Sequence, residues 1–314
     1  MNNKIKNIIN KLKGKKVDGF LVTKITNIQY LTGFTGSTAY LLITKEKSFF
    51  ITDSRYIEQA KSEVKGCEII EAKDYFANIC KTVRQNKIKK LGFEYNNLTF
   101  SQYESLKKKL KRAKLIGLKN TIEDLRVVKS PEEIGYIKKA VEIAELAFKK
   151  TLYKIKEGIT EREVACELEY NMRKSGADGI AFPTIVASGK RGSLPHGTSS
   201  DKKIKKGELI VIDFGAIYKG YCSDLTRTVG LGIINRLLRK TYKVVYLSQQ
   251  KAISLIKSGV KLSYFDKKAR RFLKKHKIHK YFTHSLGHGI GREVHDHVDQ
   301  FFRIEQGKAK FIVG

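Results

Sequence analysis

Apolar residues follow two different spacings in the first part of the chain, and each spacing predicts one kind of element. Short apolar runs between turn-forming residues predict β-strands at residues 19–23, 39–44, 48–52, 67–72 and 90–95. Apolar residues three or four positions apart predict helices at residues 1–16, 54–64, 74–87 and 101–112. Because strands alternate with helices, residues 1–126 are expected to form an α/β domain.

A domain boundary is expected in the segment TIEDLRVVKSPEEI, where this pattern changes. Ser130 is followed by a proline and then by Glu133, which is the pattern of a capping box with proline in the first helical turn. A second capping box starts at Thr160. The pattern then predicts helices over residues 131–156, 161–176, 235–257 and 264–275, a strand at 182–189 and a hairpin that begins at 209.

Two aspartates lie inside the apolar, strand-like segment VIDFGAIYKGYCSDLTRT, residues 211–228. A turn between residues 218 and 219 would place Asp213 directly opposite Asp224, with Cβ atoms about 5 Å apart on one face of the sheet. Two carboxylates so close repel each other, and a bound cation would remove that cost. The alternatives are a solvated hairpin at the sheet edge, or an ion pair between Asp224 and Arg227.

A histidine-rich segment, FTHSLGHGIGREVHDHVD, spans residues 282–299. Its glycines interrupt any regular helix, and neutral imidazoles bind Mn, Fe, Co or Zn beside carboxylates. The segment therefore predicts a site, formed from His284, His288, His295 and His297. A fifth histidine, His196, lies in the loop after the strand at 182–189, where binding residues are common, although a loop histidine by itself is usually only exposed.

The 314 residues carry a formal net charge of +32, from 63 basic and 31 acidic residues, which raises the question of nucleic-acid binding. The lysines occur in most predicted helices and no recognisable nucleic-acid motif is present, so a generally lysine-rich composition explains the charge more simply. Only non-specific, salt-sensitive binding is expected. No apolar run approaches the about 20 residues of a membrane span. Four scattered cysteines fit reduced thiols in a cytoplasmic protein.

Two long segments, FPTIVASGKRGSLPHGTSSDKKIKKGELIVIDFGAIYKGYCSDLTRTVG and HSLGHGIGREVHD, closely resemble the pita-bread metallopeptidases of the Xaa-Pro aminopeptidase and prolidase branch. The segments DGFLVTKITNIQYLTGFTGSTAYLLIT and ITDSRYIEQAK resemble the creatinase-type N-terminal domain of that branch. The resemblance implies an α+β fold, with an α/β domain over residues 1–126 and a pita-bread domain over 127–314, a curved antiparallel sheet with flanking helices. It also implies hydrolysis of the bond between an N-terminal residue and proline, and a homodimer.

In the family, the two hairpin aspartates and the histidine of the GHG motif are ligands of two divalent ions, most often manganese or cobalt, with zinc or iron as alternatives. The resemblance therefore implies Asp213, Asp224 and His288 as metal ligands here. It implies His196, His284 and His295 as catalytic residues that contact the substrate and handle protons. A water activated by the two ions would attack the scissile carbonyl.

The family also has two glutamate ligands on strands after the GHG segment. Beyond His288 this sequence offers only Glu293, where the family has no ligand, and Glu305 in the tail FRIEQGKAKFIVG. In the favoured alignment of that tail Val313 stands near the ligand position; in the other, Glu305 is the first glutamate. Both lack the last glutamate and the final strands, so the pita-bread domain is expected to be C-terminally incomplete, with one metal ion or none.

Three functions therefore remain open from the sequence. The first is an Xaa-Pro metallopeptidase, either an aminopeptidase or a dipeptidase. The second is an inactive remnant or pseudoenzyme that lacks the two glutamate ligands. The third is a basic binding protein recruited to polyanions.

Overall fold

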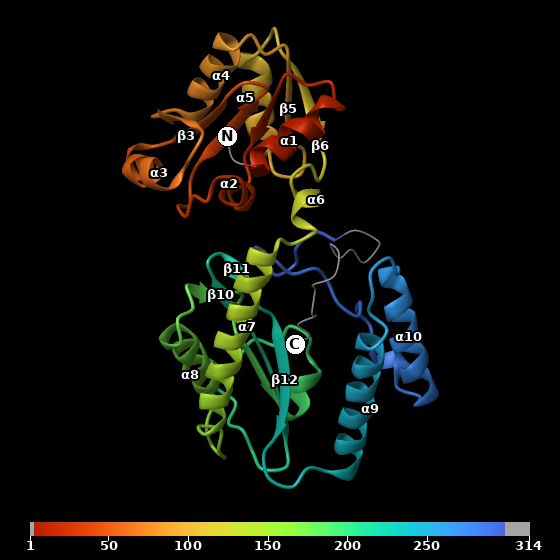
Figure 1. Ribbon diagram of the computed structural model, residues 1–314. Coiled ribbons are helices and arrows are strands. Elements are labelled where there is room, and N and C mark those ends of the chain that lie inside the picture. The colour runs from red at the N-terminus through yellow and green to blue at the C-terminus, as the bar shows by residue number, and fades with distance from the viewer. Residues whose placement is uncertain (1–2, 299–314) are drawn as a thin grey trace. The chain divides into compact units, whose positions relative to one another are not determined.

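The computed structural model describes residues 3–298, and the chain forms two compact units, Met1–Leu125 and Arg126–Gly314 (Figure 1). The first unit contains a mixed sheet of six strands in the order β4-β3-β2-β1-β5-β6. The strands are β1 (Gly19–Val22), β2 (Tyr40–Thr44), β3 (Ser48–Thr52), β4 (Glu68–Glu71), β5 (Lys90–Glu94) and β6 (Lys114–Leu118). Strand β2 pairs antiparallel with both β1 and β3, and the remaining neighbours are parallel.

Helices cover both faces of this sheet, which explains why its central strands are continuous apolar runs. They are α1 (Asn3–Lys13), α2 (Ile25–Thr32), α3 (Ile57–Glu63), α4 (Tyr75–Gln85) and α5 (Phe100–Lys109). A 3₁₀ turn at Ser54–Tyr56 precedes α3, and the short α6 (Glu123–Arg126) spans the boundary between the two units. Neighbouring strand residues point to opposite faces, so Phe20 lies in one apolar core and Leu21 in the other. The strands and helices expected here are confirmed, whereas α2, α6 and β6 were not expected.

The second unit begins with two helices whose starts match the sequence analysis, α7 (Pro131–Leu152) and α8 (Glu161–Lys174). At α7 the hydroxyl of Ser130 accepts the Glu133 N–H at 3.3 Å, and the Glu133 carboxylate accepts the Ser130 N–H at 2.7 Å. Thr160 forms the second capping box in the same way. Helix α7 ends at Leu152, before the expected position 156.

Two small sheets pack against α7 and α8. One contains β7 (Gly179–Ile180), β10 (Ala216–Tyr218) and β11 (Tyr221–Cys222), in the order β11-β10-β7. The other contains β8 (Ile185–Ser188), β9 (Leu209–Phe214) and β12 (Leu225–Gly230), in the order β12-β9-β8. Ile210, Ile212 and Phe214 of β9 point into the core, and the Phe214 ring stacks on Phe148 of α7 with centroids 5.4 Å apart.

The last two helices, α9 (Arg236–Ile253) and α10 (Leu262–Lys275), lie side by side (Figure 1). The hydroxyl of Ser248 donates to the carbonyl of Ala269 across 3.2 Å, and both residues are buried between them. A 3₁₀ turn at His279–Tyr281 follows, and the rest of the chain to residue 298 contains no helix. Among the described residues, no helix combines the length and the apolar character needed to cross a bilayer.

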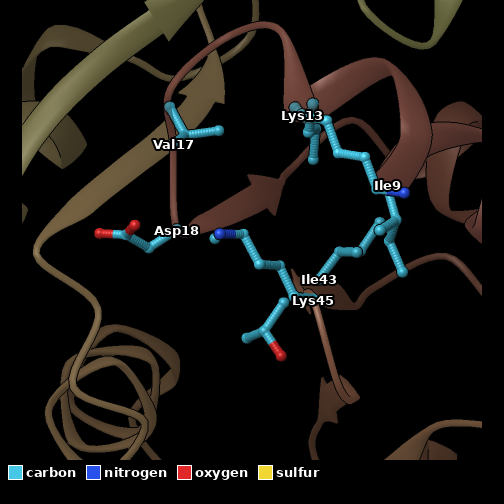
Figure 2. Close-up of a pocket in the computed structure, with 9 residues that line it drawn as sticks. Ile9, Lys13, Val17, Asp18, Ile43 and Lys45 are labelled. Carbon is cyan, nitrogen blue, oxygen red and sulfur yellow. The ribbon is translucent and has the colours of Figure 1, made fainter.

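A small, open pocket lies in the first unit, where α1 meets β1 and β2 (Figure 2). Ile9, Val17 and Ile43 form its apolar lining, and the side chains of Asp18 and Lys45 lie beside them. None of the residues expected to be catalytic or metal-binding lines this pocket.

Candidate functional site

The β9–β12 hairpin has a register that differs from the expected one by two residues. Asp213 pairs with Thr226, not with Asp224, and Tyr218 pairs with Tyr221 across the turn. The prediction that the two aspartates are directly opposed was therefore wrong. Because side chains alternate faces with a period of two, a shift of two residues keeps both aspartates on the same face, where such diagonal neighbours are typically about 7–8 Å apart.

The turn itself explains the difference in register. The loop consists of Lys219 and Gly220, which have φ angles of 48° and 74°. Positive φ at both positions is the conformation of a type I′ turn, whose twist matches that of the flanking strands. A turn between residues 218 and 219, as the sequence analysis assumed, would not have placed the glycine at a position that requires positive φ.

Asp213 lies half-buried on the face opposite to the core residues of β9, and its carboxylate accepts a hydrogen bond from the hydroxyl of Thr226 at 2.8 Å. Burial raises the pKa of Asp213. The Thr226 hydrogen bond lowers this pKa, the charge of Asp224 raises it, and His288 and His196 lower it. Asp213 therefore responds to two of the predicted histidines and to the second aspartate.

Asp224 makes its ion pair with His288. The Nε2 atom of His288 lies 3.2 Å from Oδ2 of Asp224, and the hydrogen bond between them raises the pKa of the imidazole. Arg227, considered as a partner for Asp224, instead contacts Glu145 at 3.2 Å. The structure thus brings together two residues of the predicted metal set that are far apart in the sequence.

The histidine segment is held against the hairpin by backbone contacts. The Cys222 N–H donates to the carbonyl of Gly291 across 2.8 Å, and an isolated bridge pairs Gly289 with Asp296. This arrangement brings the rings of His288 and His295 together, with centroids 4.1 Å apart. His295 therefore lies next to the Asp224–His288 pair.

The loop that carries His196 is fixed by the buried carboxylate of Glu161, at the start of α8. This carboxylate accepts hydrogen bonds from Ser188 N–H at 2.8 Å, from Arg191 Nε at 2.9 Å and from the Ser200 hydroxyl at 2.6 Å. Those partners precede and follow His196 in the chain. The sequence analysis used this helical turn only to predict the capping box at Thr160. It missed the role of Glu161 in holding the loop.

His284 and His297 contact neighbours in the histidine segment. The Nδ1 atom of His284 lies 2.7 Å from the Ser285 carbonyl, and its ring packs edge-on to Phe282. The His297 N–H donates to the carboxylate of Asp296. The site brought together by the structure therefore contains Asp213, Asp224, His288, His295 and His196.

Arg126 and Asp296 are further residues of this region that sequence reasoning missed. Arg126 donates to Asp296 at 2.8 Å and to Glu293 at 2.9 Å. Glu293, one of the two glutamates that follow His288, is thus engaged with an arginine. Glu305 and Val313 lie outside the described residues. An arginine inside the otherwise apolar stretch LRVV, residues 125–128, was the signal that could have revealed Arg126.

Carboxylates and imidazoles are ligand types that bind Mn, Fe, Co and Zn. The side chains of Asp213, Asp224 and His288 are therefore chemically suited to bind a divalent cation. The raised pKa of Asp213 beside Asp224 marks a place where a cation would relieve repulsion. Within residues 3–298, however, no group of three or more His, Cys, Asp or Glu is arranged closely enough to hold a metal. The described residues therefore supply part of a donor set, not a complete dinuclear centre.

Comparison with known proteins places these residues in a family. The profile of metallopeptidase family M24 matches residues 135–311, and that of the creatinase/prolidase N-terminal domain matches residues 4–128. The chain belongs to metallopeptidase family M24. The resemblance seen in the sequence is thereby confirmed, as is the fold of a creatinase-type N-terminal domain with a pita-bread M24 domain.

Three M24 relatives show how far the similarity extends. The Xaa-Pro dipeptidase of Pyrococcus horikoshii is 39% identical over 298 residues, which cover 94% of this chain and 83% of that protein. The structure of the Xaa-Pro dipeptidase from Bacillus anthracis has a TM-score of 0.91 and 39% identity, covering 96% of this chain and 84% of that one. The X-Pro aminopeptidase of Thermotoga maritima has a TM-score of 0.85 and 41% identity, covering 92% and 84%. Membership of M24 implies divalent metal ions.

Proposed function

We propose that this M24 chain hydrolyses the peptide bond between an N-terminal residue and a following proline. The observation that carries the proposal is the 3.2 Å contact between Asp224 and His288, on the open face of a hairpin that also holds Asp213. The proposal is also supported by proteins that are similar to this chain over most of its length, which are named Xaa-Pro dipeptidase or X-Pro aminopeptidase.

In this proposal Asp213, Asp224 and His288 hold divalent metal, with manganese as the expected ion and cobalt, zinc or iron as alternatives. A metal ion bound there would polarise the scissile carbonyl and favour ionisation of the attacking water. The chain's own residues do the positioning: the hydroxyl of Thr226 fixes one carboxylate oxygen of Asp213, and the Gly289 carbonyl lies 3.1 Å from Nδ1 of His288. These contacts orient the donor atoms before a metal or substrate arrives.

His295, His196 and His284 are the proposed catalytic residues. His295 lies against the ring of His288, from which it can donate a hydrogen bond to the oxyanion that forms at the scissile carbonyl. His196 lies in its loop close enough to Asp213 to lower the pKa of that carboxyl. It is proposed to contact the substrate. His284 is proposed to help protonate the leaving proline nitrogen.

The proposal also covers the arrangement of the protein. We assign residues 1–126 to the creatinase-like domain and 127–314 to the peptidase domain, and we expect a homodimer. Free cysteines at positions 67, 80, 166 and 222 fit a cytoplasmic enzyme.

The test is hydrolysis by the purified full-length chain with added Mn²⁺. An Xaa-Pro dipeptide and a longer Xaa-Pro peptide are compared with the same peptides carrying alanine in place of proline. Asp224→Asn and His288→Ala are the site variants, and Asp201→Asn and His279→Ala are matched controls on exposed residues outside the site. Metal content is measured on every variant.

The expected result is proline-dependent turnover that both site variants lose and both control variants keep. Equal turnover in wild type and Asp224→Asn would overturn the assignment of the metal ligands. A second candidate, a peptide-binding pseudoenzyme, is favoured by the incomplete donor set among the described residues. A folded wild type that binds the Xaa-Pro peptide without hydrolysing it would establish that candidate instead.

A further inference from the structure

The positive charge of this protein is not evenly distributed along the chain. From Leu225 to Arg292, Lys and Arg occur 17 times, and the only acidic residue is Asp266. That acid is neutralised by Arg270, whose Nε lies 2.7 Å from its carboxylate. A general lysine-rich composition would leave acids interspersed as in the rest of the chain, so it does not account for this segment.

The structure gathers part of this charge on one side of α10. Phe265, Ala269 and Leu273 form the buried side of the helix, which packs on α9. Residues three, four and seven positions apart share a helical face. The opposite face, here called the α10 basic face, consists of Tyr264, Lys267, Arg271, Lys274 and Lys275, all of them exposed.

The cations of this face are free to meet a partner. Among the described residues, no carboxylate lies within ion-pair distance of Lys267, Arg271, Lys274 or Lys275. With a rise of about 1.5 Å per residue, Lys267 and Arg271 are about 6 Å apart along the axis, and Arg271 and Lys274 about 4.5 Å. A row of unpaired cations at this spacing is complementary to a chain of phosphates.

Aromatic rings stand beside the cations. Tyr264 lies on the same face and is 41% exposed, with the Lys268 ammonium 4.9 Å from the centre of its ring. Tyr281, in the 3₁₀ turn after α10, is 73% exposed, with the Lys280 ammonium 5.1 Å from the centre of its ring. Exposed rings next to Lys and Arg allow unpaired bases to stack while the cations contact the backbone. A membrane-binding helix would instead present aliphatic residues on its outer face, and the α10 basic face has none.

We propose that the α10 basic face is a binding surface for single-stranded nucleic acid, with the phosphates on Lys267, Arg271, Lys274 and Lys275 and bases stacked on the exposed tyrosines. This surface is separate from the peptidase site, since none of its residues belongs to the cluster around Asp213 and His288. Arg270 is not part of it, because its guanidinium holds the carbonyls of Phe282 and His284.

The experiment measures binding of the full chain to a labelled oligouridine of about 20 nucleotides, longer than a typical single-stranded site. Oligothymidine, a duplex of the same length and vesicles containing phosphatidylglycerol are compared between about 50 and about 200 mM salt. The variant K267E/R271E/K274E is compared with K13E/K65E/K81E, a charge-matched control on exposed lysines of the first unit. K267Q/R271Q/K274Q repeats the test without charge reversal, and thermal unfolding checks that each variant is folded.

We expect the α10 variants to bind the single strand at least tenfold more weakly, and the slope of log affinity against log salt to become shallower by about 2 for three lost phosphate contacts. Xaa-Pro hydrolysis should stay at the wild-type level. Oligothymidine bound as tightly as oligouridine would show that the backbone and base rings, not the 2′-hydroxyl, are recognised. Equal losses in the control variant, stronger binding to vesicles than to the single strand, or no binding at about 50 mM salt would each overturn the proposal.

Discussion

Arg126 donates a hydrogen bond from Nη2 to Oδ1 of Asp296 across 2.8 Å, and both side chains are almost completely buried, at 2% and 1% exposure. The two residues are 170 positions apart in the sequence. Asp296 directly follows His295, and its Oδ1 also accepts the His297 N–H at 2.9 Å. The pair therefore ties the segment that carries the site histidines to the start of the second unit.

Arg126→Met is expected to destabilise the protein by about 3 kcal/mol, because it removes the hydrogen-bonded guanidinium from the buried carboxylate of Asp296, whose other cation, Lys129, lies 3.9 Å away. The measurement is urea unfolding. Arg162→Met is the control: Arg162 pairs with Asp201 at 2.8 Å, but both side chains are more than half exposed. Its loss should cost less than about 1 kcal/mol. Similar losses in the two variants would contradict the role given to Arg126.

The same variant tests whether Arg126 positions His295. Arg126→Lys keeps the charge and one donor, and should recover part of kcat relative to Arg126→Met, with little change in KM. A purely structural role would change the fraction of folded protein but not kcat per folded molecule.

Glu161 should make the stability of the second unit depend on acid pH. Although burial acts to raise the pKa of Glu161, hydrogen bonds from Ser200, Ser188 and Arg191 outweigh it and lower this pKa. A pKa that is lower in the folded state gives stability above the unfolded-state value of about 4.3, and this is lost as the pH falls through the folded-state value.

Glu161→Gln is therefore expected to be less stable than wild type at pH 7, by about 2 kcal/mol, because a charged acceptor of buried hydrogen bonds is replaced by a neutral one. Below the unfolded-state pKa the gap between the two proteins should narrow. Urea unfolding at neutral and at acid pH measures this. Glu142→Gln, on the exposed side of α7, should show neither effect; a constant gap at all pH values would refute the linkage.

The turn between β10 and β11 should accept asparagine better than its present lysine. Lys219 has a φ of 48°, which costs a non-glycine residue free energy, and asparagine tolerates this conformation. Lys219→Asn should stabilise by about 0.5 kcal/mol. Part of the gain is offset because the Lys219 ammonium lies 5.6 Å from the centre of the Tyr136 ring.

Gly220→Ala is the opposite change at the neighbouring position. The alanine would have to adopt the φ of 74° that Gly220 has, and its Cβ would lie 2.5 Å from Nη2 of Arg292. Destabilisation by about 1 kcal/mol or more is therefore expected. Thermal unfolding of the two variants should shift in opposite directions. A destabilised Lys219→Asn together with an unchanged Gly220→Ala would show that the turn differs from the one described.

Divalent metal should raise the unfolding temperature of the wild-type chain, because an ion that binds only the folded state stabilises it by mass action. Mn²⁺ titration followed by thermal unfolding gives the midpoint, and a chelator should reverse the shift. Asp224→Asn removes the carboxylate charge and should abolish most of the shift, whereas Asp201→Asn should keep it. Equal shifts in both variants would mean that the metal binds elsewhere.

The sequence by itself determined the elements that depend on near neighbours. Both capping boxes formed as expected, because each joins residues three positions apart and needs no tertiary partner. The face shared by Asp213 and Asp224 was also determined, since side-chain alternation survives a register error of two residues. By contrast, β6 was missed because its short, half-exposed sequence becomes a strand only by pairing with β5.

Only the tertiary structure decided which distant groups meet. The register of the hairpin followed from the positive φ angles of Lys219 and Gly220, and it gave Asp213 the hydroxyl of Thr226 as its partner. The contacts of Asp224 with His288 and of Arg126 with Asp296 join residues far apart in the chain. Such contacts follow from how the hairpin, the helices and the histidine segment pack together, and a pattern of near neighbours carries no information about that packing.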